Sequence, residues 1–288
     1  MKVGSSADPR DAARRSAPQV VIRPLHSDAE LRQCVELQRA TWGADYDDIV
    51  PSSVLKIAQK IGGVAAGAFD DDGSMLGFVF GMVGVREGRV IHWSDMLAVR
   101  ADARDSGVGA QLKEFQRAAA QASGATRMYW TYDPLVARNA HLNFNRLGVS
   151  VDEYVEDMYG ASESELHRGL GTDRFVVAWS LDGEPRDGRV GDDGSGLEAP
   201  VLNADGRLPQ ATELAAFAAS PPAIVRVEIP SDIVQVRDAA PGEAGQWRAS
   251  TRQAFQWALV NRYAVDHFLA DIQRERGYYV LVRGGASR

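Results

Sequence analysis

Hydrophobic and polar positions in the first hundred residues predict four strands and two helices. Ser27 and Glu30 have the spacing of a capping box, so a helix is expected to begin there. Pro51 is expected to open a second helix, which ends at the paired glycines after Ile61. The acidic turn 70–73 separates two apolar runs and predicts a hairpin. The expected strands are Val20–Leu25, Val64–Phe69, Met75–Val85 and Val90–Val99.

The pattern changes after residue 100, where apolar positions recur at helical spacing between short apolar runs. One helix is expected after a glycine-rich loop, with Val108, Leu112, Phe115 and Ala119 on its apolar face. The further expected elements are strands at Arg127–Tyr132, Val151–Tyr159 and Phe175–Leu181, with a helix at Ala137–Leu147. Antiparallel strands followed by a strand–helix–strand crossover predict a mixed sheet with helices on both faces, an α/β (α+β) fold.

Four parts of the chain differ in composition. Residues 1–19 are polar without a following apolar stretch, which predicts a disordered leader rather than a signal peptide, in a cytoplasmic protein. Residues 20–181 form the predicted first domain, and residues 182–222 are rich in Gly, Asp and Pro, as in a linker. In residues 223–288 the spacing predicts a small strand–helix–strand appendage, which we expect to pack on the first domain.

Composition and charge narrow the classes of function. The chain has 288 residues, 45% of them hydrophobic, which is enough for a substantial core. No run approaches the roughly 20 apolar residues that a spanning helix needs, so a membrane-embedded protein is not expected. A net charge of −7 disfavours nucleic-acid binding. A single cysteine, Cys34, argues against disulfides and cysteine metal sites, and the scattered histidines predict no metal.

The sharpest chemical signal is a glycine loop between a predicted strand and a predicted helix. It comprises Arg104, Asp105, Ser106, Gly107, Val108, Gly109 and Ala110. Backbone amides of such a loop can converge on an anion at the positive end of the helix. This loop lacks the Gly-Lys-Ser/Thr of a nucleotide P-loop. It also lacks the third glycine of a dinucleotide-binding fingerprint, although Asp133 weakly imitates the ribose-binding carboxylate of that motif. The coenzyme A pattern Arg/Gln-x-x-Gly-x-Gly/Ala fits at every fixed position.

On these residues the chain resembles the GNAT superfamily of acyl-CoA-dependent N-acyltransferases. The likeness covers about Val20 to Leu181, and more narrowly it resembles a poorly characterised bacterial subgroup of predicted acetyltransferases with a C-terminal extension. The motifs that carry it are Gly63 to Asp70, Leu112 to Arg117, Trp130 to Leu135, Arg138 to Gly148 and Thr172 to Phe175. The resemblance implies a GNAT-like fold whose central sheet is splayed, with the pantetheine threading the gap beside the strand that precedes the glycine loop.

The resemblance also implies roles for individual residues. Backbone groups of Met96, Leu97, Ala98 and Val99 would align the pantetheine and donate to the thioester oxygen, and the amides from Arg104 to Ala110 would hold the pyrophosphate. Asn139 and Phe144 would flank the sulfur end of the pantetheine. The family often has a tyrosine general acid where this chain has Phe144, so Tyr154, Tyr159, Tyr132 or a water would replace it. The first candidates for the base are Asp95, where the subgroup commonly has histidine, and His92; Glu153 is a more distant candidate.

These roles predict an N-acyltransferase that uses acetyl-CoA and acts on a small amine or amino-acid-like acceptor by direct attack in a ternary complex. One alternative transfers succinyl or another acyl group. An alternative of another class is a non-catalytic acyl-CoA-binding sensor, which the loss of the tyrosine at Phe144 keeps open. We expect no nucleic acid, membrane or metal partner, and we expect the appendage to cover part of the acceptor side or a homodimer contact.

Overall fold

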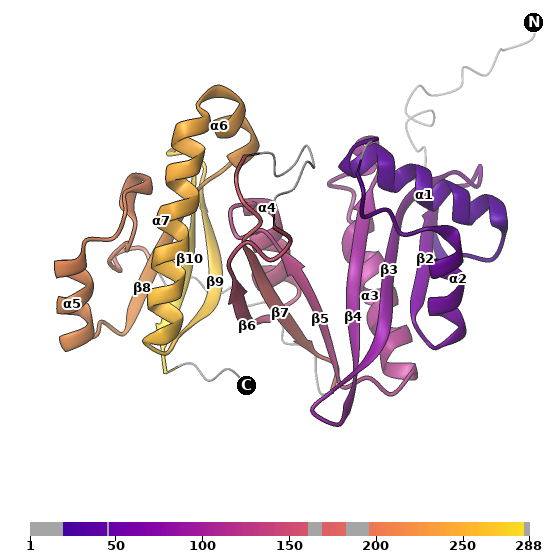
Figure 1. Cartoon of the computed structure of the whole chain (residues 1–288), viewed down its shortest axis with the longest axis horizontal. Coiled ribbons are helices and arrows are strands. Elements are labelled where there is room, and N and C mark those ends of the chain that lie inside the picture. The colour runs from indigo at the N-terminus through magenta and orange to yellow at the C-terminus, as the bar shows by residue number, and fades with distance from the viewer. Residues whose placement is uncertain (1–19, 45, 161–168, 183–195, 285–288) are drawn as a thin grey trace, which may run out of the picture.

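The computed structural model describes residues 20–44, 46–160, 169–182 and 196–284. Two sheets lie side by side, a larger one from the first part of the chain and a smaller one from its C-terminal end (Figure 1). The expected leader, residues 1–19, and residues 183–195 of the expected linker lie outside the described residues.

The larger sheet has seven strands in the order β1-β2-β3-β4-β5-β7-β6. All neighbours are antiparallel except β4 and β5, which are parallel, so the sheet is mixed as predicted. Its strands are β1 (Val21–Pro24), β2 (Val64–Phe69), β3 (Met75–Arg86), β4 (Arg89–Val99), β5 (Arg127–Tyr132), β6 (Ser150–Val155) and β7 (Arg174–Ser180).

Helices cover both faces of this sheet. Because successive strand residues point to opposite faces, Phe78 of β3 packs with α1 (Asp28–Trp42) and α2 (Ser52–Lys60), whereas Val79 packs with α3 (Val108–Ala122). The capping box predicted at the start of α1 is present.

Two predicted elements between β5 and β7 differ from the structure. The helix expected over Ala137–Leu147 is a short α4 (Ala137–Ala140) followed by a π-helical turn at His141–Arg146. The strand expected over Val151–Tyr159 ends at Val155 instead, because the chain turns there and Asp157 has a positive φ of 44°.

The second sheet belongs to the C-terminal unit, residues 196–284, and its strand order is β8-β10-β9. Its elements are β8 (Ile224–Pro230), α6 (Ile233–Ala239), α7 (Pro241–Val260), β9 (Tyr263–Asp271) and β10 (Arg276–Arg283). The predicted strand–helix–strand pattern is correct for β8, α7 and β10, but it lacks α6 and β9. Asp266 and His267 interrupt the apolar alternation of β9, so the sequence pattern gives no strand there.

The segment expected as a linker, residues 182–222, has regular structure in residues 196–222. They contain a 3₁₀ turn at Ala204–Gly206 and α5 (Ala211–Ala219). Asn203 is buried and exchanges two hydrogen bonds with the backbone of Glu228 in β8, at 2.8 and 2.9 Å. Hydrogen bonding to a neighbouring strand therefore orders a segment whose composition alone predicts disorder.

One hydrophobic core runs from the larger sheet into the C-terminal unit. Tyr279 of β10 donates its hydroxyl to the carbonyl oxygen of Pro134 at 2.6 Å, and its ring centroid lies 5.9 Å from those of Phe144 and Phe175. The C-terminal unit therefore packs on the first domain, as predicted. Within the described ranges, no helix is long and apolar enough to cross a membrane.

Candidate active site

The parallel strands β4 and β5 diverge after a short paired stretch. β4 pairs with β3 from Arg89 to Val99, but it pairs with β5 only at Ile91, His92 and Trp93. The two ribbons meet at one end and separate toward the other (Figure 1). No strand in the described part of the chain pairs with the second edge of β4 beyond Trp93, so this edge can accept an extended ligand.

A β-bulge lies where the strands begin to diverge. Ser94 is opposite Gly81 and Met96 is opposite Phe80, which leaves Asp95 as the extra residue of β4. The extra residue changes which positions face α3: His92 and Ser94 contact α3 before the bulge, and Leu97 packs with α3 after it. Asp95 follows Ser94 and so points away from α3, and the bulge keeps Met96 on that same opposite face.

The divergence of β4 from its parallel neighbour β5 is the feature expected from the resemblance. The larger sheet thus has the splayed, mixed arrangement that the resemblance implies. In this fold the glycine loop after β4 and the unpaired edge of β4 lie on one continuous stretch of chain, and α3 begins at the end of that stretch.

Solved acetyltransferase structures are similar to this chain. The acetyltransferase of the GNAT family from Streptococcus pneumoniae is 20% identical, with a TM-score of 0.44 over 56% of this chain and 99% of that chain. The aminoglycoside 6'-N-acetyltransferase complexed with coenzyme A is 14% identical, with a TM-score of 0.42 over 57% and 99%. The ribosomal-protein-S18-alanine N-acetyltransferase from Escherichia coli is 14% identical, with a TM-score of 0.44 over 59% and 98%.

No protein-family model matches the chain, and no curated protein matches it in sequence. At these identities and TM-scores, function is judged from the residues of this chain alone.

The predicted coenzyme loop has the backbone that anion binding needs. Gly107 is the N-cap of α3 and has a φ of 85°, a left-handed conformation that favours glycine. The amides of Val108, Gly109 and Ala110 follow in the first helical turn, where a helix has no internal acceptors for them. Other predicted members, Arg104, Asp105 and Ser106, are exposed beside them.

Asn139 and Phe144, predicted to flank the pantetheine sulfur, are placed differently from each other. Asn139 is half-buried in α4. Phe144 is buried in the shared core, with its ring centroid 6.4 Å from Tyr132 and 5.9 Å from Tyr279. The ring that stands at the family's tyrosine position therefore packs against the C-terminal unit.

Two acidic side chains and a tyrosine gather at the bulge. Asp95 is exposed on the surface, but the protein around it partly withdraws it from water and raises its pKa. The negative charge of Asp48, from the segment between α1 and α2, raises the pKa further. Burial raises the pKa of Tyr46 to about 12, and the charges of Asp48 and Asp95 act in the same direction. An ammonium ion beside these groups would neutralise excess negative charge. We name Asp95, Asp48 and Tyr46 the acidic cluster.

Tyr159 lies beside the acidic cluster, since its charge also acts on Tyr46. Its hydroxyl is 3.0 Å from that of Thr131 in β5, and the Arg174 guanidinium lies 5.3 Å from its ring centroid. Tyr159 is exposed, so its hydroxyl is accessible to a ligand. Of the predicted catalytic side chains, the structure brings Asp95 and Tyr159 to the same region.

His92 is on the opposite face of β4 from the acidic cluster. It is fully buried, and its Nε2 lies 3.1 Å from Nε2 of Gln116 in α3. Burial and, to a smaller extent, the charge of Lys113 lower its pKa to about 4, so His92 is neutral at neutral pH. The geometry favours a packing role for His92 over the role of base.

Tyr154 and Tyr132 are also apart from the acidic cluster. Tyr154 donates its hydroxyl to Oδ2 of Asp173 at 2.5 Å, and the Tyr132 hydroxyl lies 3.3 Å from that of Tyr279. Burial raises the pKa of both tyrosines. Glu153 is exposed on β6, the edge strand that also carries Tyr154.

The site residues predicted from the sequence do not include Lys113, whose charged side chain is buried. Lys113 of α3 is buried at the point where β4 and β5 diverge, and its Nζ donates to Oγ of Ser94 at 2.7 Å. The helical spacing of the sequence could have indicated its burial, because Lys113 and Gln116 share the buried face of α3 with Leu112.

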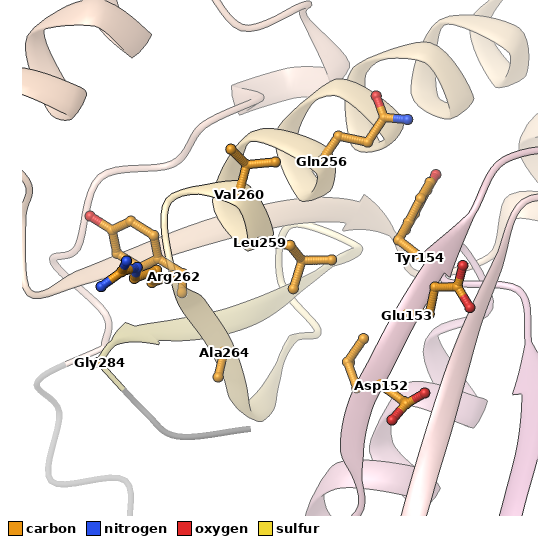
Figure 2. Close-up of a pocket in the computed structure, with 11 residues that line it drawn as sticks. Asp152, Glu153, Tyr154, Gln256, Leu259, Val260, Arg262, Ala264 and Gly284 are labelled. Atoms are coloured by element: carbon orange, nitrogen blue, oxygen red, sulfur yellow. The ribbon is translucent and has the colours of Figure 1, made fainter. Parts of the chain in front are cut away.

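A separate cavity of about 690 Å³ lies between β6 and the C-terminal unit. Figure 2 shows Tyr154 and Glu153 on one side of it and Gln256 and Leu259 of α7 on the other. This cavity includes none of the residues of the glycine loop or the acidic cluster. Among the described side chains, no group of three or more histidine, cysteine or acidic residues could hold a metal ion.

Proposed function

We propose that the protein is an acyl-CoA-dependent N-acyltransferase that transfers acetyl from acetyl-CoA to a small amine or amino-acid-like acceptor. The observation that carries the proposal is the continuity of three features. The unpaired edge of β4 has the acidic cluster at its start, at Asp95, and the glycine loop at its end, from Arg104 to Ala110. A thioester held along this edge would lie between a phosphate-binding loop and a cluster suited to an amine.

The coenzyme side of the reaction uses backbone groups. The amides at the start of α3 hold the pyrophosphate, which benefits from the positive end of the helix. The β4 backbone from Met96 to Val99 has one edge free for the pantetheine, and an amide of this edge donates to the thioester oxygen. Asn139 flanks the sulfur end of the pantetheine, and the buried Phe144 supports the turn that follows α4 by packing on Tyr279. These contacts place the carbonyl carbon near the bulge.

The acceptor side uses the acidic cluster. Asp95 takes a proton from the acceptor ammonium, directly or through one water, and so frees the lone pair that attacks the carbonyl carbon. Asp48 adds negative charge that attracts the cationic acceptor and raises the pKa of Asp95 toward the working pH. Direct attack within a ternary complex needs no covalent enzyme intermediate, because positioning and carbonyl polarisation supply the rate enhancement.

Release of free thiol from acetyl-CoA across a panel of small amines tests the proposal. Thiol release that depends on one amine class, with the acetylated amine detected by mass spectrometry, supports it. Succinyl-CoA in the same assay tests the alternative acyl group. Protection of the protein by nicotinamide dinucleotides but not by coenzyme A would instead favour the dinucleotide alternative.

The burial of Phe144 at the family's tyrosine position favours a second candidate, a non-catalytic acyl-CoA sensor. A sensor would bind acetyl-CoA, seen as a rise in melting temperature, and release no thiol with any amine. A cytoplasmic location, a homodimer and domain limits at 20–181 and 223–288 stay predictions, and the native mass of the purified chain tests the dimer.

A further inference from the structure

A lysine is buried beside the divergence of β4 and β5, and no carboxylate of the described residues pairs with it. Lys113 is 5% exposed, and among the described residues its ammonium contacts Oγ of Ser94 at 2.7 Å and the face of Trp130 at 4.0 Å from the ring centroid. Ser94 is 3% exposed. A buried ammonium held by one neutral hydroxyl and one aromatic ring is costly, because neither supplies a full counter-charge.

Lys113 and Ser94 lie close to where the proposed thioester would bind. β4 and β5 are last paired at Trp93 and Tyr129, so Ser94 and Trp130 are the first residues beyond the paired stretch on each strand. Lys113 reaches these two residues from α3, the helix that begins at the glycine loop. The pair therefore lies at the closed end of the divergence, on the coenzyme side of the sheet.

The leaving sulfur is expected on this side. The acidic cluster presents the amine from the face opposite α3, and the coenzyme chain continues from the sulfur back to the loop that opens α3. The sulfur of the proposed thioester therefore faces α3 rather than the acceptor. When the carbon–sulfur bond breaks, a thiolate forms there and needs a proton or a counter-charge.

Most hydroxyl donors expected from the sequence are not available on this side. Phe144 has no hydroxyl, Tyr132 is occupied by Tyr279, and Tyr154 donates to Asp173. Tyr159 is on the acceptor side with Thr131. Lys113 of α3 and Ser94 of β4 are the polar pair that lies at the closed end of the divergence.

We propose that Lys113, acting through the Ser94 hydroxyl, is the acid that protonates the leaving thiolate. This inference rests on the proposed acyl transfer. As the carbon–sulfur bond breaks, its electron pair goes to sulfur. The Ser94 hydroxyl gives its proton to sulfur and takes one from the Lys113 ammonium, so coenzyme A leaves as the thiol and Lys113 becomes neutral. The acceptor ammonium loses two protons: Asp95 takes the first, and the second leaves the nitrogen for solvent as the amide forms. The proton on Asp95 then returns to Lys113 through solvent, which restores both groups.

The electrostatics of the pair suit this role. Burial lowers the pKa of Lys113 to about 7, so the ammonium loses its proton more readily than a surface lysine does. The titratable neighbour on β4 is His92, which is neutral at pH 7 and adds no charge. On α3 itself, the Arg117 guanidinium lies over Trp179, 5.1 Å from its ring centroid. An arriving thiolate supplies the anion that the ammonium lacks.

The test compares Lys113→Met and Ser94→Ala with Gln116→Met, a buried control one turn along α3. For the wild type we expect kcat to fall as the pH rises above the pKa of Lys113. Lys113→Met is expected to lower kcat about a hundredfold and to abolish this fall, with little change in the KM of either substrate. Ser94→Ala is expected to lower kcat similarly, and Gln116→Met is expected to keep the wild-type pH profile.

A second readout needs no turnover. Ultraviolet absorbance of the thiolate reports the pKa of the thiol in bound coenzyme A, which we expect the wild type to lower and Lys113→Met to leave at its value in water. Unchanged kcat and unchanged thiol pKa in both variants would overturn the inference. The inference would also be overturned if Tyr159→Phe abolished the fall of kcat at high pH while Lys113→Met kept it. If the wild type acylates no amine, the proposed function fails, and the thiol titration still decides whether Lys113 stabilises the thiolate.

Discussion

Arg248 of α7 and Asp133, which follows the last residue of β5, form a buried two-point ion pair across the boundary between the first domain and the C-terminal unit. Nη1 lies 2.9 Å from Oδ1 and Nη2 lies 2.5 Å from Oδ2. Arg248 also donates from Nε to the carbonyl oxygen of Leu170 at 2.9 Å. This pair joins the end of β5 to a helix that lies 115 residues away in sequence.

Removing one partner of this pair is expected to destabilise the whole chain. Arg248→Met removes the two-point partner of Asp133 in a buried site and leaves it Arg174, at 3.9 Å, as a more distant cation, so the free energy of unfolding should fall by up to about 3–5 kcal/mol. The matched control is Arg274→Met, because Arg274 is an exposed partner of Asp271 and should cost less than about 1 kcal/mol. Urea unfolding measures both. Equal midpoints for Arg248→Met and the wild type would contradict the expectation.

The shared core predicts that the first domain is not stable without the C-terminal unit. A chain that ends at Gly191 lacks Tyr279, Phe255 and Trp247, which are buried in the same core as Phe144 and Phe175. We expect this truncated chain to be insoluble or to melt far below the full chain. A soluble truncated chain with full activity would show that the unit is dispensable.

Arg252 of α7 is expected to position Tyr159. Arg252 Nη2 lies 2.6 Å from Oδ1 of Asp173, and the same oxygen accepts from the Asp157 amide at 3.2 Å. Asp157 in turn accepts from the Thr172 amide at 3.0 Å, and Thr172 Oγ1 accepts from the Tyr159 amide at 3.1 Å. The C-terminal unit thus holds the segment that carries Tyr159.

Arg252→Ala is therefore expected to raise the KM for the amine about tenfold and to leave the affinity for coenzyme A unchanged. Arg252→Lys keeps the charge and should recover part of the loss. Steady-state kinetics with each substrate varied, together with calorimetric coenzyme binding, separates the two sides of the site. A variant that loses coenzyme affinity to the same extent would show a general loss of structure.

The pH dependence of acyl transfer should follow Asp95. Asp95 acts as a base only when it is ionised, so kcat/KM is expected to rise with pH through its raised pKa. Asp48→Asn removes one of the charges that raise the pKa of Asp95, so the rise of kcat/KM should move to lower pH. Asp95→Asn should abolish this rise and lower kcat by a factor of about 100 to 1,000. A rise that does not move in Asp48→Asn would show that another group titrates.

Coenzyme binding should depend on the glycine at the start of α3. Gly107→Ala forces a side chain into a φ of 85°, which costs about 1–2 kcal/mol and disturbs the amides that follow, so the Kd for coenzyme A should rise about tenfold or more. Gly73→Ala is the matched control, since Gly73 has a φ of 77° in the turn between β2 and β3 and a Cβ there meets nothing within 4 Å. It should lose stability and keep coenzyme affinity.

The predictable parts of the structure are those whose signals are local. Apolar alternation, the capping box and the glycine loop depend on residues within a few positions of one another, and they place β1 to β5, α1 and α3 close to where they lie. The bulge at Asp95 is not local in this sense, because it depends on the pairing of β4 with Gly81 on β3. Simple alternation already places His92 and Asp95 on opposite faces, but it would put Met96 on the α3 face, where the folded chain has Leu97 instead.

The remainder depends on contacts between distant segments. Asp133 weakly imitates a ribose-binding carboxylate in sequence, but its carboxylate is occupied by Arg248. Residues 196–222 have the composition of a linker, yet Asn203 and β8 order them. Lys113 has a buried position in the helical pattern, and only the folded chain shows that no carboxylate in the described residues meets it.

The burial of Lys113 predicts how stability depends on pH. Its pKa in the folded chain is about 7, below the ordinary value of 10.5 for an unfolded chain. Between these values the unfolded chain binds a proton that the folded chain releases, so wild-type stability rises by about 1.4 kcal/mol per pH unit from this group. Below pH 7 both states are protonated and the cost of the buried charge is constant.

Lys113→Met removes this cost and keeps the volume of the side chain. We expect the variant to melt above the wild type at pH 7, with an advantage that shrinks as the pH rises toward 10. Lys60→Met, on the exposed surface of α2, is the control and should show no such trend. Melting temperatures across this pH range measure both variants. A Lys113→Met variant that melts below the wild type at every pH would mean that the ammonium stabilises the fold, and that the site holds an anionic partner for it.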